Sequence, residues 1–145
     1  MFRNREDAAR RLAAAMKNRV LHDPLVLAIP RGGVAIGAIL ARELGADFDV
    51  VLSRKLRAPG QPELAVGAIA ESGAVYLDPG ALEYVDLPAD YLAEERRHQL
   101  GEIAQRQRLF RRVRPQAPVK GRSVIITDDG IATGSTMMAA IQTVK

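Results

Sequence analysis

Two segments of the chain share one order of features: a short apolar run, a turn built of small or polar residues, and a helical pattern. The first segment begins with the apolar run Leu25–Ile29 and the second with Ser123–Thr127. Apolar runs of this length, bounded by turn residues, are typical of strands buried on both faces, and such strands alternate with helices in parallel sheets. The sequence therefore predicts an α/β fold with a twisted, mainly parallel sheet flanked by helices.

Further helices and strands are predicted around these two segments. Asn4 is placed to cap a helix over 5–18, and Gly45 to end a helix over 34–44. The segment 54–62, RKLRAPGQP, mixes cations with proline and glycine and is expected to be an exposed, mobile connection. The remaining predicted elements are a strand over 48–53, a hairpin over 63–77 that turns at 71–73, a long helix from Pro88 to about Arg112 with mostly solvated faces, and a helix after Gly134 that runs to Lys145.

Length and composition restrict the classes of protein that this chain can belong to. A chain of 145 residues has the size of one domain. It contains no cysteine, which excludes disulfides, thiolate metal sites and a cysteine nucleophile. The N-terminus is charged and no apolar run approaches the roughly 20 residues of a membrane span, so we expect a soluble, cytoplasmic protein without membrane contact.

The turn after the last predicted strand combines two kinds of polar group. In Val124–Thr136, VIITDDGIATGST, Asp128 and Asp129 follow the strand directly. Ligands of open parallel sheets lie beyond the carboxyl ends of the strands, so both carboxylates are placed to meet one. The amides of 133–136 begin a helix whose N-terminus favours anions, and hydroxyl side chains add donors. Carboxylate acceptors beside anion-binding donors suit a sugar phosphate, whereas the lysine of a Walker loop is missing.

The segment Val124–Thr136 resembles the motif with which type I phosphoribosyltransferases bind phosphoribosyl pyrophosphate (PRPP). The resemblance covers a hydrophobic strand, two acidic residues, two variable positions and a small-Thr-Gly-x-Thr loop. Thr127 and Gly130 depart from the apolar residues that usually flank the acidic pair. The resemblance implies that Asp128 and Asp129 are catalytic and hold the ribose hydroxyls. The residues that it assigns to the 5-phosphate are Ala132, Thr133, Gly134, Ser135 and Thr136.

Two further segments resemble the parts of this family that bind pyrophosphate. The turn after the first strand resembles the pyrophosphate loop, which often contains a cis peptide bond without proline. Arg54 and Lys55 close the second predicted strand, where the family has basic catalytic residues followed by a loop that closes over the site, and Arg57 is a weaker candidate. The residues assigned to pyrophosphate are Arg31, Gly32, Gly33 and Lys55.

The resemblance also implies a reaction. A nitrogen acceptor, expected to be a nucleobase, displaces pyrophosphate from PRPP in a step of nucleotide metabolism. Mg²⁺ is the implied cofactor, bound through PRPP and water, with Asp128 and Asp129 as candidate protein ligands. The sequence does not identify the acceptor. A homodimer is the expected assembly.

The whole chain, 1–145, is expected to form a single phosphoribosyltransferase-like domain. Within it, 54–78 would be a mobile loop and hairpin and 79–114 a helical insertion or hood over the acceptor. Because the family core continues beyond the motif helix, the domain is expected to be truncated at its C-terminus.

Two other functions stay open. One is a regulatory protein that senses PRPP without transferring it, with the basic segment Arg96–Arg114 facing a nucleic acid. Nucleic-acid binding is not expected, however, because Phe110 is the single aromatic residue among these arginines and one residue does not make an interleaved aromatic pattern. The other is a phosphatase or receiver-like domain with Asp128 as nucleophile, which lacks a lysine partner and leaves the Thr-Gly-Ser-Thr loop unexplained.

Overall fold

The computed structural model describes all residues, 1–145, and divides them into two compact units. The first unit, called here the parallel unit, comprises residues 1–51 and 116–131. The second, called the antiparallel unit, comprises residues 52–115 and 132–145. Each unit has its own sheet and its own hydrophobic core, and each is described separately below.

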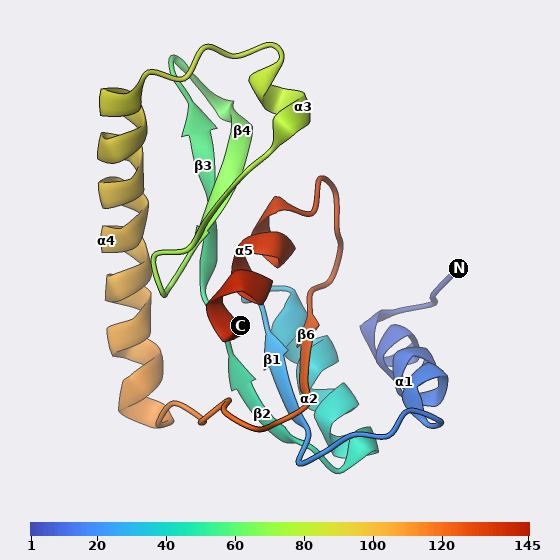
Figure 1. The fold of residues 1–145 in the computed structure, drawn as a ribbon. Helices are drawn as coiled ribbons and strands as arrows, with labels where there is room; N and C mark the ends of the chain where they lie inside the picture. Colours follow the sequence, from blue (N-terminus) through green and yellow to red (C-terminus); the bar gives the residue numbers. More distant parts are fainter. The chain divides into compact units, whose positions relative to one another are not determined.

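The sheet of the parallel unit has three strands, β1 (Leu25–Ala28), β2 (Asp47–Val50) and β6 (Val124–Thr127). Their order is β2-β1-β6 and both pairings are parallel, which confirms the predicted α/β fold with a parallel sheet (Figure 1). The central strand β1 is buried throughout, as its apolar run predicted. The prediction that the last strand is equally buried is wrong: β6 has one strand neighbour, and only its final residue, Thr127, is buried.

Two helices complete the parallel unit, α1 (Arg5–Met16) and α2 (Gly33–Leu44). The predicted cap of α1 is confirmed, because the Asn4 side chain accepts a hydrogen bond of 2.8 Å from the amide of Asp7. Gly45 ends α2 in the left-handed conformation that favours glycine. A cluster of buried side chains joins α1, β1 and α2: Ala13, Val26, Leu40 and Ala41.

The amino ends of the three parallel strands are tied together by Arg122, whose side chain is only 6% exposed. Its guanidinium donates to the carbonyl of Asp23, just before β1, at 2.8 Å, and to the carboxylate of Asp47, which begins β2, at 2.6 Å. Arg122 itself lies two residues before β6. One buried cation just before β6 therefore contacts the segment that precedes β1 and the first residue of β2.

The sheet of the antiparallel unit contains β3 (Ser53–Ala58), β4 (Gln61–Ala70) and β5 (Val75–Leu77) in the order β3-β4-β5. The prediction of an exposed connection over 54–62 is therefore wrong. Most of that segment belongs to strands, and Leu56 of β3 is fully buried. The reason is that Pro59 and Gly60, the latter at φ +69°, form a tight turn, so that β3 folds back onto β4. The predicted hairpin between β4 and β5 is confirmed.

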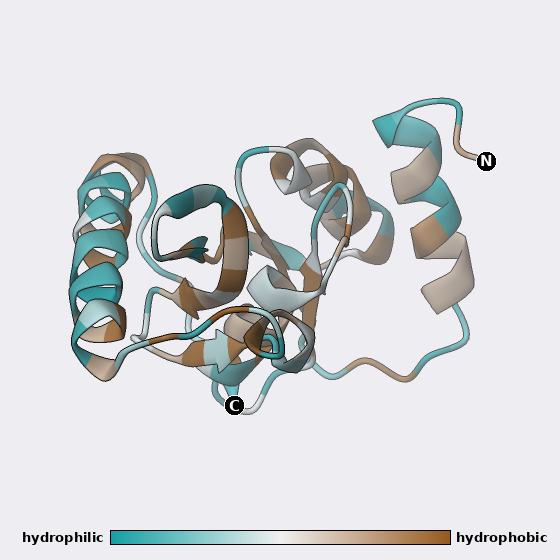
Figure 2. Ribbon diagram, turned by 90° about the horizontal axis from the view of Figure 1, so that it is seen from above, coloured by the Kyte–Doolittle hydropathy of each residue, from teal (hydrophilic) through white to brown (hydrophobic).

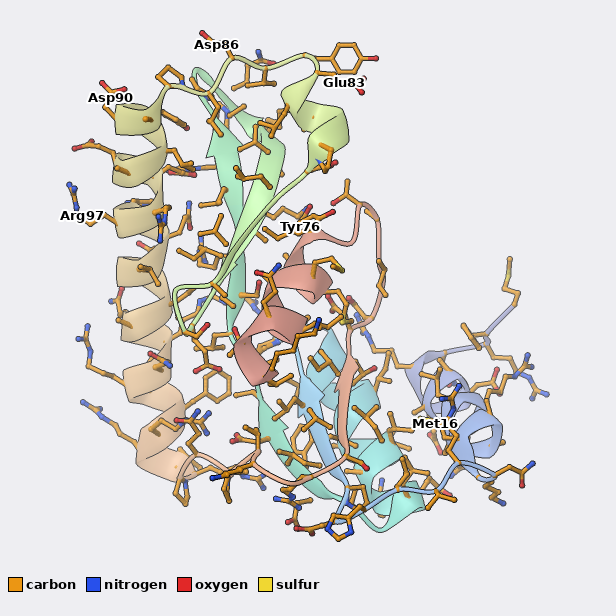
Figure 3. The ribbon with its side chains drawn as sticks, in the orientation of Figure 1. Met16, Tyr76, Glu83, Asp86, Asp90 and Arg97 are labelled. Atoms are coloured by element: carbon orange, nitrogen blue, oxygen red, sulfur yellow. The ribbon has the colours of Figure 1, made fainter.

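Three helices belong to the antiparallel unit: α3 (Pro79–Leu82), α4 (Ala89–Val113) and α5 (Ser135–Val144). The long helix predicted after Pro88 is confirmed as α4, which runs alongside β3 and β4 (Figure 1). Figure 2 shows α4 as predominantly hydrophilic, and Figure 3 shows Arg97 projecting from its outer side. Two clusters of buried side chains lie in this unit: Leu52, Leu56, Ala58, Val66, Ile69 and Ile103 form one, and Ala68, Ala70 and Ala139 form the other.

None of these helices combines the length and the apolar character that crossing a membrane requires.

Candidate functional site

In the parallel unit, the turn after β1 and the acidic pair after β6 leave the same edge of the sheet. The two strands are paired up to Ala28 and Thr127, and the amide of Ile29 donates to the carbonyl of Thr127 at 2.9 Å. Asp128 is half-buried and Asp129 is exposed, so neither carboxylate belongs to the core. This edge is therefore where two of the segments singled out in the sequence meet.

Glycine is required in the turn after β1 because the acidic pair packs against its backbone. A β-carbon on Gly32 would lie 1.9 Å from a carboxylate oxygen of Asp129, and one on Gly33 would lie 2.9 Å from the carbonyl oxygen of Thr127. Gly32 has φ −64°, so its backbone conformation suits any residue, and only the position of the Asp129 carboxylate leaves no space for a β-carbon. The peptide bond between Pro30 and Arg31 in this turn is cis.

The two carboxylates of the acidic pair have different electrostatic surroundings. Burial raises the pKa of Asp128, and the neighbouring Asp129 carboxylate raises it further, although a 2.8 Å hydrogen bond from the amide of Asp129 acts in the opposite direction. Asp129 instead has a cationic partner, since the guanidinium of Arg5 donates to its Oδ2 at 3.2 Å. The pair thus combines a carboxylate that is harder to ionise with one that is neutralised from α1.

Arg5 and Asp129 also line an open cavity of about 340 Å³. Its other lining residues are Arg31, Gly32 and Ala35. No local sequence signal marks Arg5, because it lies 124 residues from Asp129 along the chain and only the fold brings the two together. The cavity therefore offers two guanidinium groups, one carboxylate and a glycine backbone to a ligand.

In the antiparallel unit, the start of α5 follows the small-residue loop of the motif. Gly134 adopts φ +85° and has no capping side chain, so amides of the first turn after that of Ser135 stay available to an anion. Ala132 and Thr133 are exposed, whereas Ser135 is buried and its amide and hydroxyl contact the Thr133 hydroxyl. Of the predicted phosphate-binding hydroxyls, that of Ser135 is thus already engaged within the loop.

The basic residues of β3 differ in their surroundings. The Nε of Arg54 donates to Gln99 of α4 at 2.7 Å, and Lys55 is exposed. Arg57 is bound to Glu95 of α4 by its amide at 2.6 Å and by two guanidinium nitrogens at 2.8 and 3.0 Å. Lys55 is therefore the most accessible of the three to a ligand, and Arg57 serves the packing of α4.

The contacts of Arg54 and Arg57 reveal a buried polar stripe on α4 that was expected to be solvated. Tyr91, Glu95 and Gln99 are spaced four residues apart and therefore share one helix face. Burial tends to raise the pKa of Glu95, but hydrogen bonds from Arg57 and Gln99 outweigh it, and the net effect is a lowered pKa. Glu95 in turn raises the pKa of Arg57. The spacing of these residues was the signal that could have identified the stripe.

Metal ligands are sparse in this chain. No group of three or more histidine, aspartate or glutamate side chains is arranged to hold a metal ion. Asp128 and Asp129 are the carboxylates that the acidic turn offers.

A family model and two curated relatives point to one family. Residues 2–145 match the family model described as phosphoribosyl transferase domain. Two proteins of Mycobacterium tuberculosis, from strains CDC 1551 and H37Rv and each named "Putative phosphoribosyl transferase", are 41% identical to the chain over 145 residues. The chain spans 33% of the length of these relatives, about a third. The crystal structure of TT1426 from Thermus thermophilus is 47% identical, with a TM-score of 0.78 over 99% of this chain and 68% of that one.

Proposed function

Because the chain belongs to the phosphoribosyl transferase domain family, we propose that it binds PRPP and transfers its 5-phosphoribosyl group to a nitrogen acceptor, with release of pyrophosphate. A nucleobase is the acceptor class that we propose, and a homodimer in the cytoplasm is the proposed assembly. The segment 79–114 is the proposed hood over the acceptor, and the hairpin within 54–78 is the proposed moving part.

The observation that carries the proposal is the contact between the glycine turn and the acidic pair. Asp129 packs so closely on Gly32 that a β-carbon there would fit only if the carboxylate moved away. A ligand that contacts Asp129 therefore also meets bare backbone and the guanidinium of Arg31, which lines the same cavity. Vicinal hydroxyls and an attached diphosphate are the groups that match this combination of carboxylate, amides and cation.

Each group is assigned one part of PRPP. Asp128 and Asp129 accept hydrogen bonds from the ribose hydroxyls and favour positive charge at the reacting carbon. The loop Ala132–Thr136 and the start of α5 bind the 5-phosphate, which anchors the substrate at a distance from the bond that breaks. Arg31, Gly32, Gly33 and Lys55 stabilise the negative charge that develops on the leaving pyrophosphate, and Arg54 supports them.

The donor set fits Mg²⁺ only when the substrate supplies most of the ligands. Two adjacent carboxylates are too few to hold the ion alone, and the ion prefers water and phosphate oxygens in addition to one or two carboxylates. Asp128 and Asp129 are the residues that would contact Mg²⁺ or its waters. When bound with PRPP, the ion would neutralise charge on the pyrophosphate.

Titration calorimetry with PRPP and Mg²⁺ tests the ribose assignment. The variant Asp128→Asn with Asp129→Asn keeps the shape of both side chains and removes both charges. We expect PRPP affinity to fall at least about 30-fold, because hydrogen bonds to charged groups contribute roughly 1.5–3 kcal/mol each. A matched control is Glu83→Gln with Asp86→Asn, two exposed acidic residues of the antiparallel unit labelled in Figure 3.

Three results would count against the proposal in different ways. Unchanged affinity in the double variant would remove the ribose role of the acidic pair. An equal loss in the control would show that net charge and not the site governs binding. Tight PRPP binding without pyrophosphate release, in a screen of purine, pyrimidine and other nitrogen acceptors, would favour a PRPP sensor over a transferase.

A further inference from the structure

Arg5 is the charged residue of the Asp129 cavity that lies in neither of the ligand-binding segments recognised in the sequence; Ala35, the other residue outside them, carries no polar side chain. It is the first residue of α1, and its backbone position is fixed by the cap of that helix. The side chain of Asn4 accepts from the amide of Asp7, and the carboxylate of Asp7 accepts from the amide of Arg3 at 3.0 Å. The helix start therefore holds the guanidinium of Arg5 within reach of the acidic pair.

The ion pair between Arg5 and Asp129 is weakly held. The side chain of Arg5 is 61% exposed and that of Asp129 is 40% exposed, and the two meet through a single contact of 3.2 Å. Exposed pairs of this kind typically contribute between about 0 and 1 kcal/mol to stability. Arg5 therefore loses little when it exchanges this partner for a more strongly charged anion.

The cavity as a whole has the charge of an anion site. Arg5 and Arg31 supply two positive charges to its lining and Asp129 one negative charge. Arg31 makes no ion pair with any residue of the chain, so its guanidinium is not neutralised in advance. Guanidinium groups bind phosphate oxygens through two parallel hydrogen bonds, and two of them around one cavity suit a ligand with two linked phosphates.

Resting on the proposed function, we propose that Arg5 is a binding residue for the diphosphate arm of PRPP. In the free protein Arg5 neutralises Asp129. When the ribose hydroxyls take over Asp129, Arg5 turns to the diphosphate beside Arg31. The N-terminal helix thereby contributes a charge to the site that the two recognised loops do not supply.

Calorimetry with three probes separates this role from others. The full chain and its Arg5→Gln variant are titrated with PRPP, with inorganic pyrophosphate and with ribose 5-phosphate, each in the presence of Mg²⁺. We expect Arg5→Gln to lower the affinity for PRPP and for pyrophosphate about tenfold, the loss typical of one charge-assisted hydrogen bond. The affinity for ribose 5-phosphate should fall less than about twofold. Arg5→Lys keeps the positive charge but loses the paired hydrogen-bond donors of the guanidinium group. Its affinity for PRPP and pyrophosphate should therefore lie between those of the unmodified chain and Arg5→Gln.

Arg10→Gln is the matched control. Arg10 lies on the same helix, is similarly exposed, and pairs with Glu6 at 2.7 Å, so its loss should leave all three affinities unchanged. An equal weakening of ribose 5-phosphate in Arg5→Gln would overturn the proposal, since Arg5 would then act only through Asp129. Unchanged pyrophosphate binding would overturn it as well.

Failure of the proposed function gives a different result from failure of the Arg5 role. If the unmodified chain binds neither PRPP nor ribose 5-phosphate, the site itself is refuted. If the unmodified chain binds both ligands and Arg5→Gln has the same affinity for every probe, only the role of Arg5 is refuted. Should Arg5→Gln fail to fold by circular dichroism, Arg5→Lys decides, because weaker pyrophosphate binding with unchanged ribose 5-phosphate binding still supports the role.

Discussion

At the scale of single residues, the absence of one β-carbon at Gly32 sets how closely the glycine turn approaches the acidic pair. The three atoms nearest to a β-carbon there all belong to the side chain of Asp129. Because the Asp129 side chain is exposed, it can rotate away without disturbing the backbone. An added methyl group would therefore displace the carboxylate and leave the fold intact.

Gly32→Ala should weaken PRPP binding about tenfold or more while lowering the melting temperature by less than about 3 °C. The loss arises because Asp129 moves out of reach of the ribose hydroxyls, and one hydrogen bond to a charged group corresponds to about that factor. Calorimetry measures the affinity, and differential scanning calorimetry measures the melting temperature.

Gly101→Ala provides the comparison, because a β-carbon on Gly101 of α4 meets nothing within 4 Å. Alanine is preferred to glycine within a helix by about 1 kcal/mol, so this variant should be more stable and bind PRPP unchanged. If Gly32→Ala kept full affinity, the contact between the turn and Asp129 would have no bearing on the ligand.

Residue types could be predicted from the sequence where the reason for them is local. Asp128 and Asp129 directly follow an apolar strand, and the glycines directly follow another, so the order of residues alone put both at the carboxyl edge of the sheet. Arg5 could not be found in this way, because its partner is distant in sequence. The engagement of the Ser135 hydroxyl was also hidden, since it depends on how the loop turns into α5.

At the scale of secondary-structure elements, α4 is held to β3 by buried polar groups as well as by apolar packing. The side chain of Glu95 is only 3% exposed, and it receives hydrogen bonds from Arg57 and Gln99. The hydroxyl of Tyr91 donates to the carbonyl of Arg57 at 2.7 Å. The polar groups of Glu95 and Gln99 are satisfied within this network, so the helix can bury them without an unpaired atom.

Glu95→Gln should lower the free energy of unfolding by about 1–2 kcal/mol at pH 7, because a charge-assisted contact with Arg57 becomes a neutral one. The folded-state pKa of Glu95 lies below its ordinary value of 4.5. Ionised Glu95 therefore stabilises the fold above pH 4.5, and this stabilisation is lost as the pH falls through the folded-state pKa. Urea unfolding between pH 7 and pH 3 should show the difference between the two proteins shrinking with acid.

Glu94→Gln is the control for this experiment. Glu94 is the neighbouring residue on α4, its side chain is 79% exposed, and its contact with Arg97 is 3.6 Å long. Its replacement should change stability by less than about 0.5 kcal/mol at any pH. A pH-independent difference for Glu95→Gln would mean that packing and not charge accounts for its effect.

Elements were predictable from the sequence where a single pattern decided them. The apolar run of β1 and the capped helices α1 and α2 are examples. Strand β3 was missed because its cations and the nearby Pro59-Gly60 pair are typical of loops, whereas the pair in fact forms the turn that allows β3 to pair with β4. Its charged side chains are tolerated in a strand because α4 supplies partners for Arg54 and Arg57.

At the scale of the whole molecule, the chain divides into two compact units, and each of them contains a cluster of buried apolar side chains. Leu40 belongs to the core of the parallel unit and Ile103 to that of the antiparallel unit. The division into these two units could not be predicted from the sequence, because nothing in composition or length distinguishes their residues. Segments distant in the chain also alternate between the units, which no local pattern reveals.

Ile103→Ala should destabilise the antiparallel unit by about 2–4 kcal/mol, since truncating a fully buried aliphatic side chain leaves a cavity. Hydrogen exchange followed by mass spectrometry should show faster exchange in β3, β4 and α4 than in β1 and α2. Leu40→Ala should give the reverse pattern. Equal acceleration everywhere in both variants would show that the two cores unfold as one.

The strand-start contacts of Arg122 lie at the end of the parallel sheet opposite to the acidic pair. The contacts that Arg122 makes with the starts of β1 and β2 are therefore separate from the residues proposed to bind the ligand. Stabilising substitutions around Asp23 and Asp47 are therefore expected to leave the proposed PRPP binding unchanged.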